Sequence, residues 1–529
     1  MLVWFVIAPV LTAVFLYVFS SAKTGRLIAL AAQTALVGCA AYLFALCKEG
    51  EIVTRIGDYE GYLGIFLKAD SLSSVFVLLT AFIFLIAALY SFHENNSGLF
   101  WFLLFIWEGL LIGVFLTRDL FNIFVLVEVA TVTVAVLIMY NRDNRSMYDG
   151  MIYLMANTVA IQFYLFGVGY IYKLTGVLDM DAAARAAGTL DSASLILPYA
   201  LIMTSVSLKC AFMPLFSWLP KAHGTPGAPS SVSAVLSGLH IKSGVYLFIR
   251  FQELFQETAV PEFFLIVGIV TGIAGFVMAL SQTDIKLILA YHTISQIGLI
   301  MIGLNVADDY TFTGGLYHII NHALFKSALF LSAGMIIHAY GTRNIYDIRG
   351  VFRRKPLIGA ATVMAVFGIT GAPLFNGSVS KYFIMYGTNR FVSGAMMIIN
   401  LGTIISFIKY STILFGRPQS EPEAVKIDGC QQAAVLILGV LCFVGGISGE
   451  QFIEFMFNVK VSVDASGYLE KTGMFAASAI AGFFIFKYYV KKSALLKRIH
   501  EIDLSFRGIC VSMGAFFALI LIVTKIFSA

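Results

Sequence analysis

The sequence predicts an all-α polytopic membrane protein of about 14–16 transmembrane helices, with two inverted five-helix repeats. Hydrophobic residues make up 59% of the chain and charged residues only 12%, which is about half the charged share of a soluble domain. Apolar runs of about 18 or more residues recur from end to end, and each is long enough to span a bilayer. Two of these runs combine a lysine with a helix break, and they lie an odd number of spans apart.

The apolar runs predict about 16 membrane crossings of about 20 residues each. The first run, residues 1–20, lacks a basic start and is too long for a signal peptide, so it is expected to remain as a span. No convincing strands are predicted, and the polar gaps of at most about 25 residues leave no room for a soluble domain. The expected centres of the spans, in chain order, lie near residues 10, 36, 80, 107, 130, 162, 207, 241, 269, 295, 326, 372, 404, 439, 480 and 518.

The spans group into four expected units. An odd offset between two similar broken spans reverses their orientation, which is typical of inverted repeats in transporters. The predicted units are N-terminal flanking helices over 1–92, a first five-helix repeat over 98–255, an inverted second repeat over 258–416, and C-terminal helices over 431–529.

Basic residues gather in the odd-numbered predicted loops, which hold about twice the Lys and Arg of the even-numbered loops. The clusters are residues 141–145, 342–355 and 487–500. The positive-inside rule then places these loops in the cytoplasm and both termini outside. The predicted localisation is the cytoplasmic membrane of a prokaryote, and the net charge of +5 gives no support to nucleic-acid binding.

The six cysteines form no C-x-x-C pair and no metal-ligand spacing. No glycine-rich phosphate loop follows a strand, and no haem, iron–sulfur or nucleotide motif is present. The chain itself is therefore expected to hold no metal and no cofactor, and it shows no redox or hydrolytic site.

Ionisable residues in the middle of spans are the main functional signal, since each costs about 2.5–3.5 kcal/mol or more to place there. Glu128, Lys209, Lys242 and Lys326 are too central to reach the membrane surface easily, so a role in ion transport is predicted for each. Two further residues, Glu108 and Lys409, have simpler explanations: a polar contact between helices for the first, and snorkelling to the interface for the second.

His318, His322 and Lys326 are spaced four apart, so they lie along one face of a helix. A zinc hydrolase would place a glutamate after the first histidine, but Ile319 stands there, and the lysine would repel a cation. Histidine titrates near neutral pH, so a proton relay is the favoured interpretation.

Each predicted helix break lies beside a lysine. Pro214 follows Lys209 by five residues, and its missing N–H and bulky ring release backbone carbonyls from the helix. Because irregular backbone at membrane depth is tolerated only inside protein or beside water, each break and its lysine predict one hydrated, protonatable site. The second break and its lysine are Gly371, Pro373, Gly377 and Lys381.

Five segments carry a family resemblance: "LTRDLFNIFVLVEV", "KCAFMPLFSWLPKAHGTPGAPSSVSAVLSGLHIKSGVYLFIR", "DIKLILAYHTISQIG", "HIINHALFKSALFLSAG" and "PLFNGSVSK". From about residue 70 to 415 the chain resembles the antiporter-like membrane subunits of respiratory complex I, Mrp-type sodium/proton antiporters and energy-converting membrane-bound hydrogenases. It looks closest to the Mrp-like and hydrogenase branch, whose fold has 14 core helices in two inverted repeats.

The resemblance implies roles in proton translocation. Glu128 matches the family's fifth-helix glutamate, and Lys209 matches its lysine partner on the seventh helix. The connecting, central and twelfth-helix positions correspond to Lys242, His318, His322, Lys326 and Lys381. The accessory candidates are Glu108, Asp119, His240, His292 and Lys409.

Three positions depart from the family pattern. Arg118 stands where the Mrp branch usually has glycine, and His292 takes the place of a common serine. Both are expected to alter the path by which protons arrive or leave. Leu374 replaces the second proline of the usual twelfth-helix pair.

The leading functional hypothesis is a proton-translocating subunit of a membrane-bound redox complex. The resemblance then implies other integral membrane subunits as partners, together with peripheral hydrogenase-like subunits that carry iron–sulfur clusters and, in a hydrogenase, a nickel–iron centre. One alternative is a subunit of an Mrp-type Na⁺/H⁺ antiporter. Another is the membrane subunit of an inorganic-carbon uptake system, which would copurify with a zinc protein. A purely structural anchor is disfavoured by the number of charges at mid-membrane depth.

Overall fold

The computed structural model describes residues 1–19, 23–57, 64–417, 427–500 and 504–527. Within these residues, 14 helices are long and apolar enough to cross a membrane, which confirms the predicted fold class. Two shorter apolar helices, α1 (Val3–Phe19) and α16 (Pro356–Thr370), add to them. Every predicted centre falls within a helix except residue 372, which falls in a break between α16 and α17 (Asn376–Ile384).

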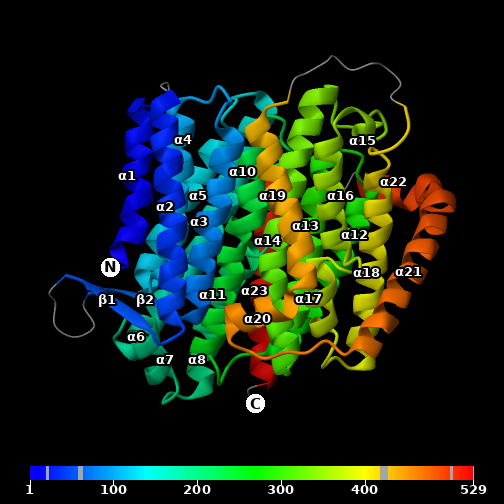
Figure 1. The fold of residues 1–529 in the computed structure, drawn as a ribbon. Helices are drawn as coiled ribbons and strands as arrows, with labels where there is room; N and C mark the ends of the chain where they lie inside the picture. The colour runs from blue at the N-terminus through cyan, green and yellow to red at the C-terminus, as the bar shows by residue number, and fades with distance from the viewer. Residues whose placement is uncertain (20–22, 58–63, 418–426, 501–503, 528–529) are drawn as a thin grey trace.

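The helices pack together as one bundle (Figure 1). After α1, the flanking helices are α2 (Lys23–Cys47) and α3 (Ser71–Ser91). The first repeat comprises α4 (Gly98–Leu116), α5 (Leu120–Ile138), α6 (Asn144–Thr175), α8 (Ser192–Lys209) with α9 (Trp218–Gly224), and the continuous run α10 (Ser230–Val235), η1 (Leu236–His240) and α11 (Ile241–Leu254). The second comprises α12 (Pro261–Ser281), α13 (Ile285–Asn305), α14 (Asp309–Tyr340), the pair α16 and α17, and α18 (Arg390–Ser411).

The two repeats share local features in opposite orientations. Helices α6 and α14 are each 32 residues long and end at a glycine in the left-handed conformation. In each repeat the chain then forms an isolated antiparallel bridge to the residue that caps α5 or α13. The first bridge is followed by α7 (Met180–Ala187) at the lower end of Figure 1, and the second by α15 (Val351–Arg354) at the upper end. The bridges are Asp119↔Asp179 and Asp284↔Asn344.

The prediction of no strands is wrong in the gap after the second span. Strands β1 (Ile52–Ile56) and β2 (Ile65–Ala69) pair antiparallel, with Ile52 opposite Ala69. Their β-branched and aromatic residues suit a half-buried strand, but each run is too short to stand out among the apolar helices. The backbone N–H of Arg118 donates to the carbonyl of Phe66 at 2.9 Å, which ties the hairpin to the start of the first repeat.

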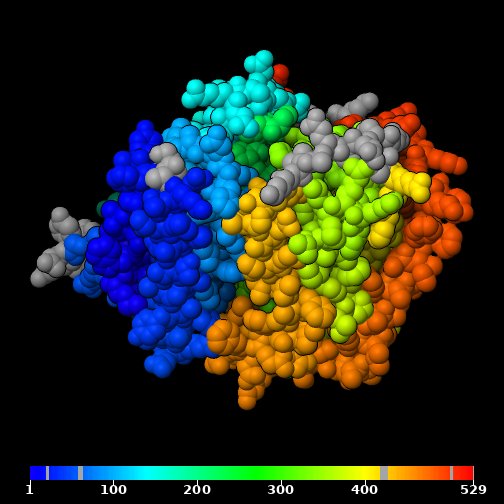
Figure 2. Space-filling view, turned by 45° about the horizontal axis from the view of Figure 1, so that its top comes forward, coloured from blue at the N-terminus to red at the C-terminus, as the bar shows by residue number. Residues whose placement is uncertain are grey.

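The C-terminal helices wrap the outside of the two repeats. Helix α19 (Gly429–Ile447) packs between α3 and α16, and Figure 2 shows it in amber, with α20 (Gly449–Phe457) below it. Helix α21 (Ala465–Tyr488) packs on α18, whereas α22 (Ala494–His500) reaches α12 and α23 (Phe506–Phe527) reaches α8. The last helices therefore contact both repeats.

Candidate functional site

The seventh span is discontinuous, as predicted. Helix α8 ends at Lys209, and Pro214 lies in the connection that leads to α9. Ala211 has a φ of 54°, a left-handed conformation that is uncommon for a residue with a side chain. The free backbone N–H of Met213 donates to Thr271 Oγ1 of the second repeat at 3.0 Å, so the break is held by a polar contact within protein.

The twelfth span is broken in the same way. Gly371 ends α16 at a φ of 77°, and Pro373 lies in the connection. Leu374 has a φ of 68°, which a proline ring, fixed near −65°, cannot adopt, and this explains why the second proline is missing. Gly377 is the second residue of α17, and any Cβ there would collide with the carbonyl oxygen of Gly368.

Lys381 uses a carbonyl that the second break sets free. Its ammonium donates to the carbonyl of Ile369 at 2.8 Å, in the last turn of α16. The last carbonyls of a helix have no partner within the helix and carry partial negative charge, so they stabilise a cation. Lys381 is buried, with 5% of its surface exposed.

Lys209 is held by a hydroxyl and makes no direct contact with Glu128. Its ammonium donates to Thr131 Oγ1 at 2.7 Å, one helical turn along α5 from Glu128. Glu128 lies toward the surface of α5, where one carboxylate oxygen accepts from Thr158 Oγ1 at 3.3 Å and the other is buried without a partner. The two predicted partners therefore occupy neighbouring positions that no hydrogen bond or ion pair joins.

A small cavity of about 10 Å³ connects Lys209 to the next helix. Its polar lining is Lys209, His240 and Ser243, and its volume is about what one water molecule requires. His240 bonds the Tyr153 hydroxyl at 3.0 Å and accepts from the Trp107 indole N–H at 3.3 Å. This histidine therefore lines the same cavity as Lys209, and Lys242 stands two residues further along the chain.

Lys242 and His322 are in direct contact. The Lys242 ammonium bonds His322 Nδ1 and also donates to the carbonyl of Ser237. That carbonyl belongs to η1, a π-helical turn, in which the regular hydrogen-bond ladder is interrupted. Both side chains are fully buried, and His322 Nε2 has no partner.

His318 continues the row toward Lys381. One ring nitrogen bonds Ser380 Oγ at 2.8 Å, and the other bonds the side-chain oxygen of Gln296 at 3.1 Å. His318 lies one turn from His322 on α14, and Ser380 directly precedes Lys381 on α17. We call Lys209, Lys242, His322, His318 and Lys381 the lysine–histidine row.

Lys326 and His292 lie beside this row. The Lys326 ammonium donates to the carbonyl of Leu289 on α13 at 2.6 Å. The His292 ring is 4.8 Å from that of Phe407, and both of its nitrogens are buried without a hydrogen-bond partner. These two side chains place further titratable nitrogen next to α13 and α14.

The remaining accessory candidates are held in other ways. Gln33 on α2 donates to a Glu108 oxygen, which is the interhelical polar contact predicted as the simpler alternative. Asp119 caps α5 by accepting from Asn122 N, and burial raises the pKa of this carboxyl. The expected snorkelling of Lys409 is wrong: only 2% of it is exposed, and its ammonium bonds carbonyls that α12 leaves free at its C-terminal end.

The structure describes all three lysines of the row, and none of them forms an ion pair. Each ammonium bonds neutral groups: a hydroxyl, backbone carbonyls or an imidazole. An amine without an ion-pair partner is free to exchange its proton with neighbouring polar groups. The row can therefore hold protons and pass them on.

Sequence reasoning missed the neutral partners of the row. Thr131, Ser380 and Gln296 lie inside segments that carry the resemblance or directly beside them, each within four residues of a titratable position. His223 on α9 was also missed; it stacks on Phe330 at 4.6 Å, and neither ring nitrogen has a partner. Uncharged side chains and a single histidine are too common in spans to be recognised from spacing alone.

Arg118, one of the three positions that depart from the family pattern, belongs to a buried cluster of charged side chains. Arg118 and Arg250 both bond the carboxylate of Asp70, at 2.5 and 2.6 Å. Burial alone would raise the pKa of Asp70, but Arg250 and Arg118 together hold it below its usual range. Because Asp70 also caps α3, Arg118 fixes the flanking helix and the hairpin to the first repeat.

Three side chains with metal-binding atoms meet at one surface: His93, Asp428 and Cys430, with those atoms within 4.8 Å of one another. The sequence spacing did not predict this group. Both Asp428 oxygens are already used, one by His93 Nδ1 at 2.9 Å and the other by the backbone N–H of Cys430 at the start of α19. The group is accounted for as a helix cap.

Inverted repeats with two broken helices and a buried row of lysines and histidines define an antiporter-like membrane subunit. The chain belongs to the family described as NADH:quinone oxidoreductase/Mrp antiporter, TM, whose sequence profile matches residues 117–408. A Na(+)/H(+) antiporter subunit of Alkalihalophilus pseudofirmus is 28% identical over 441 residues, which cover 80% of this chain and 88% of that protein. An NADH-quinone oxidoreductase subunit of Desulforudis audaxviator is 30% identical over 421 residues, 74% of this chain and 83% of that protein.

Solved structures share the fold. A chain of the Mrp complex from Dietzia sp. matches with a TM-score of 0.78 and 23% identity, and the match covers 90% of this chain and 99% of that one. A chain of the archaeal membrane-bound sulfane sulfur reductase matches with a TM-score of 0.78 and 21% identity, over 91% and 99% of the two chains. A chain of respiratory complex I from Thermus thermophilus has a TM-score of 0.75 at 21% identity, over 90% and 100%.

Proposed function

We propose that the chain translocates protons along the lysine–histidine row as one subunit of a larger membrane complex. The observation that carries the proposal is the unpaired row itself: buried amines and imidazoles that bond only neutral groups. A sodium path would need several oxygen ligands around the ion, whereas ammonium groups would repel it. The transported ion is therefore H⁺.

The row suggests an order of proton steps. Lys209 exchanges a proton with His240 through the cavity that both line, the proton passes on to Lys242, and Lys242 exchanges with His322 by direct contact. His322 passes the proton one turn along α14 to His318, and Ser380 links His318 to Lys381. In each step one nitrogen loses a proton and the next one gains it, so no cofactor is needed within this chain.

Glu128 is the proposed point of coupling to a neighbouring subunit. It lies among exposed apolar residues of α5, such as Val125 and Val129, so a partner helix can pack there. A charge change in that partner moves the Glu128 carboxylate relative to Lys209. Because burial disfavours an ammonium without a nearby opposite charge, Lys209 then releases its proton.

We further propose that a redox complex drives this cycle. Peripheral iron–sulfur subunits, with a nickel–iron centre in a hydrogenase, would supply the electron transfer, and other integral membrane subunits would carry the coupling. The names of the relatives support two drivers, because one is a Na(+)/H(+) antiporter subunit and the other an NADH-quinone oxidoreductase subunit. An Mrp-type antiporter without a redox partner is the second candidate.

Identifying the partners separates the two drivers. The native complex is extracted in mild detergent, and its subunits are identified by mass spectrometry. The redox proposal predicts iron–sulfur subunits in the complex. Small membrane subunits alone would overturn it in favour of an antiporter, and a zinc protein would indicate inorganic-carbon uptake instead.

Proton transport by the row is tested separately, by a double-mutant comparison in the reconstituted complex. Lys242→Ala and His322→Ala should each abolish proton transport, and the double variant should be no worse, because the two residues serve one transfer. Lys497→Ala, at an exposed lysine of α22, is the matched control. Transport that survives either single substitution would refute the proposed path.

A further inference from the structure

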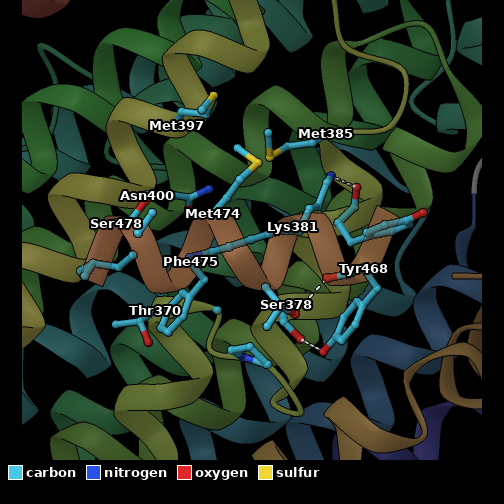
Figure 3. Close-up of a pocket in the computed structure, with 17 residues that line it drawn as sticks. Thr370, Ser378, Lys381, Met385, Met397, Asn400, Tyr468, Met474, Phe475 and Ser478 are labelled. Carbon is cyan, nitrogen blue, oxygen red and sulfur yellow. Dashed lines mark hydrogen bonds between the residues drawn. The ribbon is translucent and has the colours of Figure 1, made fainter. Parts of the chain in front are cut away.

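A cavity of about 250 Å³, lined by apolar side chains and a few polar ones, lies beside Lys381, and α21 forms its outer wall (Figure 3). Helix α17 contributes Lys381 to the lining, and α18 contributes Asn400, whose side-chain oxygen is buried without a hydrogen-bond partner. Thr472 and Ser478 line it from α21. The cavity has room for several water molecules and enough polar groups to hold them.

The two halves of α21 are attached to the protein in different ways. It has 24 residues, and only Gly482 and Phe486, both in its C-terminal half, are buried. A Cβ at Gly482 would lie 3.2–3.4 Å from isoleucine side chains of α18, so the two helices touch closely there. The N-terminal half of α21 is instead separated from α18 by the cavity.

Two polar contacts hold this N-terminal half over the second break. The Tyr468 hydroxyl accepts from the backbone N–H of Leu374 and bonds Ser378 Oγ, both at 3.0 Å. The Lys471 ammonium donates to the carbonyl of Tyr382 at 3.2 Å and lies 4.6 Å from the centre of the ring of that residue. Figure 3 shows Tyr468 beside Ser378, close to Lys381.

We propose that the N-terminal half of α21 is a gate that controls access of water to Lys381. Tyr468 and Lys471 are positioning residues that latch the gate to α17, and the close contact at Gly482 is its pivot. Releasing the latch opens the cavity to the membrane face at which α21 begins. The gate lies outside residues 117–408, so the family match does not cover it.

The gate rests on the proposed function in one respect, that Lys381 carries a transported proton. Its opening can nevertheless be measured without transport. Thr370→Cys places a thiol in the cavity next to Lys381, and Ala465→Cys places a control thiol at the exposed start of α21. The exposed Cys39 is replaced by serine in every variant.

The experiment measures the rate at which a membrane-impermeant methanethiosulfonate modifies these thiols in the intact, reconstituted complex. Tyr468→Phe removes both hydrogen bonds of the tyrosine hydroxyl, and Lys471→Gln removes the ammonium; the loss of one hydrogen bond changes the equilibrium between closed and open gate by about fivefold. Modification of Thr370→Cys should therefore be at least about fivefold faster in either variant, and only from the face where α21 begins. The rate at Ala465→Cys should not change.

An unchanged rate at Thr370→Cys in both latch variants, or modification from the opposite face, would overturn the gate. If one latch variant fails to assemble, the other decides the matter. Faster modification in a complex that does not transport protons would leave the gate intact and refute the proposed function. If proton transport requires the row but the latch substitutions leave the modification rates unchanged, the gate is refuted and the proposed function stands.

Discussion

At the scale of single residues, the buried lysines of the row are held by neutral hydrogen-bond partners. Thr131 accepts from Lys209 and at the same time donates to the carbonyl of Val127 at 2.8 Å, so its hydroxyl is fixed in place. The lysine has three N–H donors and only this one partner among the described residues. Small changes around it should therefore alter how easily it gives up a proton.

Thr131→Val keeps the shape of the side chain and removes the acceptor. Losing a hydrogen bond to a charged group costs about 1.5 kcal/mol, so proton transport by the reconstituted complex should fall about tenfold. Thr133→Val on the same helix is the control, since that hydroxyl bonds only the carbonyl of Val129. Equal transport by the two variants would show that Thr131 has no part in holding Lys209.

Leu374 is a second position at which the choice of residue is expected to change the stability of the protein. Its φ of 68° is strained for leucine, natural for glycine and forbidden for proline. Leu374→Gly should be neutral or more stable by about 1 kcal/mol, whereas Leu374→Pro should cost about 3 kcal/mol and also lose the hydrogen bond to Tyr468. Unfolding by SDS titration measures both changes, and similar stability of the two variants would contradict the assigned backbone conformation.

At the scale of elements, the ends of helices carry most of the chemistry. Lys381 and Lys409 both bond carbonyls at helix C-termini, Lys242 bonds a carbonyl of a π-helical turn, and Lys209 itself ends α8. Helix ends expose partial charges that a continuous span hides from lipid. The breaks thus create the polar positions that the row needs at membrane depth.

The ion cluster at Asp70 tests how the flanking elements are joined to the repeats. Asp70→Asn can still cap α3, but it leaves Arg118 buried without a counter-charge and Arg250 with only its ion pair to the exposed Glu253. Stability should fall by about 3 kcal/mol. Asp191→Asn, at the exposed cap of α8, is the control and should change stability by less than about 0.5 kcal/mol.

The pH dependence of this effect has a definite sign. The pKa of Asp70 is lower in the folded protein than in the unfolded chain, so its contribution is complete above the unfolded pKa of about 4 and disappears as the pH falls through the folded value. The difference in stability between the wild-type protein and Asp70→Asn should therefore shrink as the pH falls below about 4. A difference that stayed constant would mean that the arginines do not act on this carboxylate.

At the scale of the whole molecule, the sequence was enough to predict the spans, the two breaks and their inverted relation. Apolar runs of bilayer length and isolated glycines and prolines are strong local signals, as the breaks beside Lys209 and Lys381 show. The hairpin over β1 and β2 was missed because its strands are short and flanked by long apolar helices. The burial of Lys409 was missed because its acceptors come from α12, far away in sequence.

The order of the row also required the structure. Spacing along α14 relates His318 to His322, but only the packing of α11, α13 and α17 around that helix brings Lys242, Gln296 and Ser380 to them. These contacts join segments of both repeats and depend on no local pattern. The proposed proton path is thus a property of the assembled bundle.

Proton transport by the intact complex in proteoliposomes, compared between the wild-type protein and Lys209→Ala, tests the central claim most directly. The row predicts that transport is lost in Lys209→Ala, while the complex still assembles and Lys497→Ala transports like the wild type. Undiminished proton transport by an assembled Lys209→Ala complex would contradict the account.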